Sequence, residues 1–203
     1  MEARQIRIRQ AVDSDARGIA QVHIDSWRST YSGIVPADHL AGLDYDEREE
    51  RWHRILADRR QNAFVAEDRG GRIIGFVSGG PERSGSPAAS ATASCSDDPQ
   101  IESGVPEPST APEYSAELYA IYLYESGQRQ GVGRRLVAAL CSWFLSQGWH
   151  SMLTWVLTDN PSRNFYEALG GEEVRVEGIA IGGTELVEVA YGWGDISPLT
   201  AGS

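Results

Sequence analysis

The spacing of apolar and polar residues changes several times between a strand period and a helix period. Short alternating or continuous apolar runs predict strands at residues 5–10, 62–68, 72–80, 116–124, 151–157, 172–178 and 184–193. Apolar residues three and four positions apart predict helices from Asp13 to the break at 29–36, and at 36–58, 132–147 and 160–171. Strands and helices in this order predict an α/β domain with a mixed sheet.

Residues 81–113 do not follow either period. They hold six of the nine prolines, seven serines and no aromatic residue. Such a segment buries too little apolar surface to offset the entropy cost of ordering it. We therefore predict one domain at 1–195 with a disordered insertion at 81–113, followed by a tail at 196–203.

The charge of the chain narrows the classes of partner. The net charge of −11 argues against nucleic acid and against an anionic membrane surface, and favours an amine-bearing substrate. No apolar run is long enough to span a membrane. All 18 basic residues are arginine, which excludes mechanisms that need lysine, such as Schiff bases and Walker A phosphate binding.

The cysteines and histidines give no metal-binding pattern. The four histidines lack ligand spacing and no Cys-x-x-Cys pair accompanies them, so we predict no metal. Cys95 and Cys141 are interpreted as unpaired thiols. Together with an N-terminus that lacks an apolar signal segment, this predicts a cytoplasmic location.

The strongest chemical signal is the turn 128–135, Gln-Arg-Gln-Gly-Val-Gly-Arg-Arg, which follows a strand and begins a helix. Glycines let a ligand approach the backbone, and the unpaired N–H groups of a helix start favour negative charge. Three arginines add to this, so the turn predicts a phosphate site, with a solvated basic turn as the alternative. Walker A is excluded by the missing lysine, and the dinucleotide fingerprint by Leu136 at its third glycine.

This turn resembles the pyrophosphate loop of the GNAT acetyltransferase superfamily, Q/R-x-x-G-x-G/A, through Gln128, Gly131 and Gly133. Further along, Asn160, Phe165-Tyr166 and Gly170 resemble a second signature of that family.

The second signature has two departures, Arg163 where a small residue is usual and Gly171 where an aromatic residue is usual. They put the packing near Tyr166 in question. The likeness covers the chain apart from 81–113 and the tail.

The resemblance implies a mixed, mostly antiparallel central sheet flanked by helices. It implies an N-acetyltransferase that moves an acetyl group from acetyl-CoA directly to an amine of a small molecule or a protein N-terminus. The alternative is a GNAT-fold module that binds CoA or a protein without catalysis. A homodimer is left open. The resemblance assigns the following residues to cofactor binding: Leu123, Gln128, Arg129, Gln130, Gly131, Val132, Gly133, Arg134 and Asn160.

The resemblance also implies the reacting groups. Tyr166 stands at the position of the acid that protonates the departing CoA thiolate. Glu117, 11 residues before Gln128, is the expected base for the amine. Strand alternation puts Glu117 on the same face as Leu123 but about 20 Å away, so a water or a strand bulge is required.

The acceptor amine is expected to meet the first helix. His23, Trp27 and Tyr31 are predicted to line its pocket, and His23 is a rival base. Each assignment has a structural alternative: Tyr166 and His23 as core residues, Glu117 at the rim of its strand, and Trp27 in plain helix packing.

Overall fold

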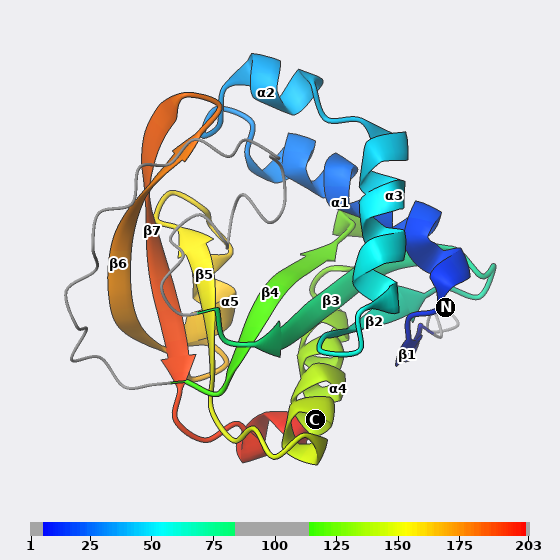
Figure 1. Cartoon of the computed structure of the whole chain (residues 1–203), viewed down its shortest axis with the longest axis vertical. Helices are drawn as coiled ribbons and strands as arrows, with labels where there is room; N and C mark the ends of the chain where they lie inside the picture. The colour runs from blue at the N-terminus through cyan, green and yellow to red at the C-terminus, as the bar shows by residue number, and fades with distance from the viewer. Residues whose placement is uncertain (1–5, 84–113, 202–203) are drawn as a thin grey trace.

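The computed structural model describes residues 6–83 and 114–201. Seven strands form one sheet in the order β1-β2-β3-β4-β5-β7-β6 (Figure 1). The β4–β5 pair is parallel and every other neighbouring pair is antiparallel, which confirms the predicted mixed, mostly antiparallel sheet. The strands are β1 (Arg7–Gln10), β2 (Asn62–Glu67), β3 (Ile73–Pro81), β4 (Ala116–Leu123), β5 (Met152–Leu157), β6 (Glu172–Ile181) and β7 (Thr184–Trp193).

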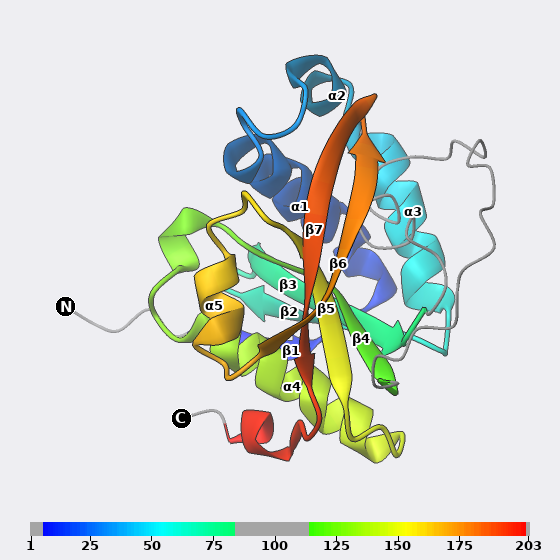
Figure 2. The same ribbon diagram turned by 90° about the vertical axis from the view of Figure 1, so that its left-hand side faces the viewer.

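Helices cover both faces of this sheet (Figures 1 and 2). α1 (Ala16–Thr30) and α3 (Tyr45–Ala57) pack on one face, where Ile19 and Trp52 meet Phe76 of β3 in an apolar core. α4 (Val132–Ser146) and α5 (Arg163–Glu167) lie on the other face. The remaining helical turns are α2 (Ala37–Ala41), η1 (Asp13–Asp15), η3 (Glu125–Gly127) and η4 (Ser197–Thr200).

The single helix predicted at 36–58 is two helices in the structure. α2 ends where the N–H of Gly42 bonds the carbonyl of Asp38. α3 begins after Asp44, whose carboxylate accepts the backbone N–H groups of Asp46 and Glu47. Such a side-chain cap satisfies N–H groups that have no partner inside a helix, so it sets the start of α3.

The predicted insertion and tail begin in ordered structure. β3 continues to Pro81, one residue into the segment 81–113. Glu82 then pairs with Arg175, while 84–113 lies outside the described residues. At the other end, Ile196 is fully buried and η4 packs against α4. Ile196 and Leu199, in the segment predicted as a tail, therefore pack on the domain.

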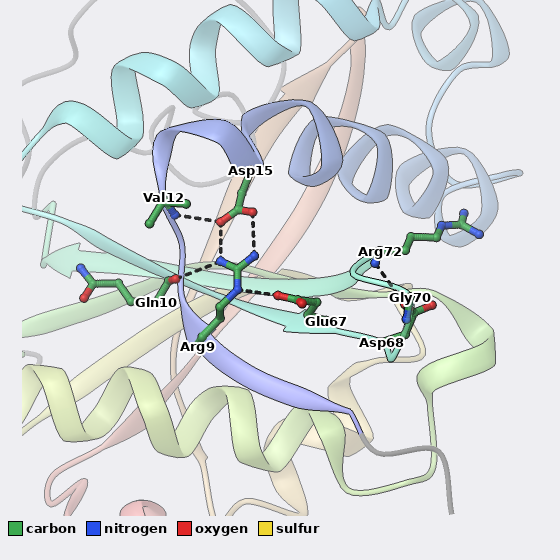
Figure 3. A network of polar contacts seen from close by, with 8 residues as sticks. All are labelled: Arg9, Gln10, Val12, Asp15, Glu67, Asp68, Gly70 and Arg72. Atoms are coloured by element: carbon green, nitrogen blue, oxygen red, sulfur yellow. Dashed lines mark hydrogen bonds and ion pairs between the residues drawn. The ribbon is translucent and has the colours of Figure 1, made fainter.

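A charged network anchors the start of α1 to the sheet (Figure 3). The guanidinium of Arg9 donates to both carboxylate oxygens of Asp15, at 2.6 and 2.8 Å, and to Glu67 at 2.5 Å. Asp15 also accepts the backbone N–H of Val12 at 2.8 Å. The hydrogen bonds from Arg9 lower the pKa of Asp15. These contacts hold α1, which carries His23 and Trp27 and ends just before Tyr31, against β1 and β2.

Candidate active site

The two parallel strands in the middle of the sheet separate soon after they begin. β4 and β5 pair at Ala116 with Met152 and at Glu117 with Leu153, and diverge toward their carboxyl ends (Figure 1). Backbone groups at such an interruption need partners other than a strand. The carbonyl of Leu118 accepts the hydroxyl of Thr154 at 2.9 Å instead.

The loop after β4 reaches the open end of this strand pair. Gln128 donates its side-chain amide to the carbonyl of Leu123 at 3.0 Å, so two predicted cofactor residues contact each other. Arg129 and Gly131 have positive φ, 57° and 75°, which turns the chain sharply into α4. The first N–H groups of α4 have no helical partner and carry the positive end of its dipole. This geometry can hold an anionic group such as a pyrophosphate.

Most side chains of the predicted pyrophosphate loop face solvent. The side chain of Val132, the first residue of α4, is buried in the core, so only its backbone is available to a ligand. The exposed members are Gln128, Arg129, Gln130, Gly131 and Arg134. Their assignment to acetyl-CoA stays a prediction.

Close packing joins the two sequence signatures. A Cβ atom at Gly133 would lie 3.2 Å from the ring of Phe165, so a glycine lets α5 pack against the start of α4. Arg134 reinforces the contact by donating to the carbonyl of Ala168 at 2.8 Å. Tyr166, on α5, is thereby held next to the loop.

Polar side chains from several elements meet where β4 and β5 have separated. The side-chain amide of Asn160, after β5, donates to the hydroxyl of Tyr31 at 3.1 Å. That hydroxyl lies 3.4 Å from the hydroxyl of Tyr122 on β4. Tyr166 is buried beside them, and its phenol shares a hydrogen bond with Thr154. We call these five residues the hydroxyl cluster.

The surroundings of Tyr166 favour the protonated form of its phenol. Burial raises the pKa of its phenol, and the nearby phenol of Tyr31 raises it further. The phenol therefore keeps its proton at neutral pH. Its ring stacks on Tyr191, with centroids 5.8 Å apart. The packing around Tyr166 is thus well formed despite Arg163, whose guanidinium bonds the Tyr191 hydroxyl and the carboxylate of Glu173.

Asn160 uses both ends of its side chain within the protein. The side chain is buried, its oxygen accepts the N–H of Ser162 at 2.8 Å, and its nitrogen bonds Tyr31. Its role in cofactor binding stays a prediction, but the structure also gives it the task of orienting Tyr31.

The buried carboxylate of Glu117 is held in an ion pair with the partly exposed Arg83. Arg83 contacts Oε1 through Nη2 at 2.5 Å and Oε2 through Nε at 3.1 Å, and its guanidinium stacks 3.7 Å above the ring of Tyr119. The role of Glu117 as the base stays a prediction, although its carboxylate already has a bidentate cationic partner.

The prediction that Glu117 and Leu123 lie on the same face of β4 is wrong. The register with β3 shifts between Leu118 and Ala120, so Tyr119 is an extra residue in a β-bulge. Leu118 and Leu123 both pack toward α4, although five positions separate them. Because a bulge reverses strand alternation, Glu117 and Leu123 face opposite sides of the sheet.

His23 and Trp27 are packed in the core on the α1 side. The imidazole of His23 stacks on Tyr122, with centroids 5.0 Å apart, and lies 5.4 Å from Phe76 and 6.0 Å from Trp52. Burial lowers its pKa well below the usual value, so the ring is neutral, and in the described part of the chain neither nitrogen has a hydrogen-bond partner. Trp27 is only 2% exposed. Their roles toward an acceptor stay predictions.

Two residues of the hydroxyl cluster were not predicted, Tyr122 and Thr154. The signal for Tyr122 is its place between the expected neighbours of the thioester, on the face that turns toward α1.

Across 6–83 and 114–201, the structure shows no group of three or more His, Cys, Asp or Glu residues placed to bind a metal. None of the helices in these ranges has the length and apolar character of a membrane span.

Comparisons with known proteins show the family to which the chain belongs. Residues 24–171 match the model of the acetyltransferase (GNAT) family. The chain is 40% identical over 195 residues to the uncharacterised N-acetyltransferase YuaI of Bacillus subtilis (strain 168), covering 96% of each chain.

Solved structures share the fold. An N-acetyltransferase from Staphylococcus aureus Mu50 superposes with a TM-score of 0.65 at 18% identity, covering 95% of this chain and 99% of that one. The PaiA N-acetyltransferase from Thermoplasma acidophilum, in complex with coenzyme A, gives 0.60 at 17% identity, covering 91% and 98%. From the family match and the 40% relative, the chain belongs to the GNAT acetyltransferase family and is an acyl-CoA-dependent N-acyltransferase.

Proposed function

We propose that this protein transfers the acetyl group of acetyl-CoA directly to an amine, carried by a small molecule or by a protein N-terminus. The observation that carries the proposal is the separation of β4 from β5 beside the loop 128–134. The loop and the start of α4 would hold the pyrophosphate. The backbone edge of β4 near Leu123 would hold the pantetheine arm, which is rich in amide groups.

The residues present fit such a ligand. Gly131 has a positive φ and open space around it, so the backbone there is accessible. The exposed arginines 129 and 134 supply positive charge in an otherwise acidic chain. The related PaiA enzyme was crystallised with coenzyme A, which supports the same ligand here.

The chemistry follows from holding both reactants together. An oriented amine and thioester react without the entropy cost of a bimolecular encounter, which is worth up to about 7–11 kcal/mol. A fixed backbone N–H on β4 would stabilise the negative charge that develops on the thioester carbonyl. Tyr166 would then protonate the sulfur as the carbon–sulfur bond breaks.

The test is turnover with a panel of amines. Purified protein, acetyl-CoA and one amine at a time are assayed for free CoA thiol and, by mass spectrometry, for an acetylated acceptor. The panel holds a polyamine, several amino acids, an aminoglycoside and a peptide with a free N-terminus. The same peptide with a blocked N-terminus is the matched control.

The proposal expects one acceptor class to be acetylated, with CoA released in equal amount and no reaction of the blocked peptide. Acetyl-CoA binding by calorimetry without turnover of any amine would instead support a non-catalytic CoA-binding module. Absence of binding would overturn the site at 128–134.

A further inference from the structure

The α1 side of the sheet presents a partly exposed indole beside the open end of the parallel strand pair. On β5, Val156 packs in the same apolar cluster as α4, whereas Leu157 packs with Trp27 and Tyr31. Because side chains alternate along a strand, Trp155 faces the same side as Leu157. Trp155 is partly exposed, although every other residue of β5 is buried. The central strand is therefore not fully covered at this indole.

A buried carboxylate lies next to Trp155 on the neighbouring strand. In the β5–β7 pair, Trp155 lies opposite Ala190 and Leu157 lies opposite Glu188 (Figure 2). Val189, between them on β7, packs in the α4-side cluster, so Glu188 faces the α1 side together with Trp155. Glu188 is only 2% exposed. Such diagonal neighbours are about 7–8 Å apart, which is within reach of an indole ring.

The proposed reaction leaves this face to the acceptor. Acetyl-CoA would enter the gap between β4 and β5 from the loop 128–134 and the start of α4, so its arm would fill the α4 side. The amine then reaches the thioester from the α1 side. The two strands last pair at Glu117 with Leu153, and Leu157 lies about 13 Å further along β5. Glu188, opposite Leu157, is therefore beside the open part of the gap.

The charges on this face favour a positively charged group. Arg175 of β6 contacts the carboxylate of Glu82 at 2.9 Å, so its charge is compensated. Glu177 lies opposite Glu188 in the β6–β7 pair and adds a second carboxylate to the same face. Glu188 also has a contact within the protein, but a carboxylate offers about four lone-pair sites to hydrogen-bond donors. A further cationic partner would offset the cost of burying this charge.

The strand positions indicate which part of an acceptor would meet Glu188. β5 lies between β7 and the gap, and neighbouring strands are about 4.8 Å apart. The nitrogen that attacks the thioester lies at the gap. A group bound by Glu188 is therefore a different part of the acceptor, separated from the attacking nitrogen by several bonds.

We propose that Glu188 and Trp155 bind a second positively charged group of the acceptor, so that this enzyme acetylates diamines and polyamines in preference to amines with a single charge. A carboxylate binds an ammonium group through charge-assisted hydrogen bonds, and the face of an indole attracts a cation. The net charge of −11 also attracts such acceptors. This inference rests on the proposed function and names its acceptor class.

The experiment compares two acceptors of equal length, putrescine and n-pentylamine, in which a methyl group replaces the second amine. The parent should have the higher kcat/KM with putrescine. Glu188→Gln keeps the shape of the side chain and removes its charge. We expect it to lower kcat/KM for putrescine by about 10–100-fold, mainly through KM, and to leave the value for pentylamine nearly unchanged.

Glu185→Gln is the matched control. It makes the same chemical change on the same strand, but Glu185 is exposed and, three positions before Glu188, faces the other side of the sheet. This variant should keep the parent kcat/KM for both acceptors. The acetyl-CoA dissociation constant, measured by calorimetry, should be the same in the parent and in both variants.

Trp155 gives a second test that does not depend on the folding of Glu188→Gln. Trp155→Leu removes the aromatic face, whereas Trp155→Phe keeps one. We expect Trp155→Leu to raise KM for putrescine by about 2–5-fold, and Trp155→Phe to recover part of this loss. An equal rise in KM for both acceptors would contradict recognition of a cation.

The outcomes distinguish this inference from the proposed function. If the parent acetylates amines but shows no preference for putrescine over pentylamine, the inference is wrong while the acetyltransferase activity stands. Equal losses for both acceptors in Glu188→Gln would also overturn it, because Glu188 would then not recognise the second charge. If the parent acetylates no amine, the proposed function fails and the inference fails with it.

Discussion

Replacing Gly131 by alanine isolates the backbone conformation of the proposed pyrophosphate loop. Gly131 has φ of 75°, and a Cβ atom there would meet nothing within 4 Å. The change therefore adds no clash and acts only through the left-handed conformation. That conformation costs an L-residue roughly 1–2 kcal/mol, and the stiffer unfolded chain offsets about 0.4–1 kcal/mol of it.

The net loss in the free energy of unfolding is about 1 kcal/mol. For a chain of this length, such a loss lowers Tm by roughly 2–4 °C. The strain is partly relieved by a shift of φ at the alanine, and this shift rotates the neighbouring peptide planes. The N–H groups at the start of α4 then no longer converge on one anion. We expect acetyl-CoA affinity to fall by at least about tenfold, which corresponds to about 1.4 kcal/mol.

Gly148 offers a matched control after the other end of the same helix. Its φ is 80°, and it too has open space where a Cβ would be. Gly148→Ala should lose similar stability, measured by urea unfolding, and keep the parent dissociation constant, measured by calorimetry. Asparagine tolerates the left-handed region better than alanine, so Gly131→Asn should recover part of both losses.

Two results would refute the reasoning in different ways. An unchanged dissociation constant in Gly131→Ala, together with the stability loss, would mean that this loop does not hold acetyl-CoA. Unchanged stability in both alanine variants would mean that the left-handed conformation carries no strain at these positions.

Three further predictions concern single side chains. Asp15→Asn should cost roughly 2 kcal/mol by urea unfolding at pH 7. Because Arg9 lowers the folded-state pKa of Asp15, its contribution is present above the unfolded value near 3.9, and the difference from the parent should shrink as pH falls below about 4. Tyr166→Phe should lower kcat by about 10²–10⁴-fold and leave acetyl-CoA binding intact by calorimetry. Glu117→Gln should lower Tm, because the ion pair with Arg83 is weakened, and should leave the pH profile of kcat/KM unchanged. If the variant instead loses the acidic limb of that profile, Glu117 is the base.

The parts of the site that lie close together in the sequence were predictable from it. The loop 128–135 combines a strand end, glycines and a helix start within a few residues, so its local chemistry does not depend on distant contacts. The same holds for Phe165 and Tyr166 on their short helix. The close approach of Gly133 to Phe165 then follows from packing two neighbouring elements of the same fold.

Contacts between distant segments could not be predicted in this way. The bond from Asn160 to Tyr31 joins positions 129 residues apart, and the pair of Arg83 with Glu117 joins positions 34 apart. Polar residues carry no periodic signal that would identify such partners. Hydrophobic spacing likewise missed the break between α2 and α3, because Asp44 acts through its side-chain cap.

The β-bulge at Tyr119 explains why Glu117 was predicted to lie on the wrong face of β4. Period-two alternation assumes an unbroken ladder, and one extra residue moves every later side chain to the other face. The cause lies partly in β3, where a Cβ at Gly79 would lie 2.6 Å from the carbonyl oxygen of Glu117 and 2.7 Å from Phe144. Only glycine allows β4 and α4 to approach so closely there. The face on which Glu117 lies therefore depends on a pair of strands and a helix together, and a proton route inferred from one strand alone rests on the wrong geometry.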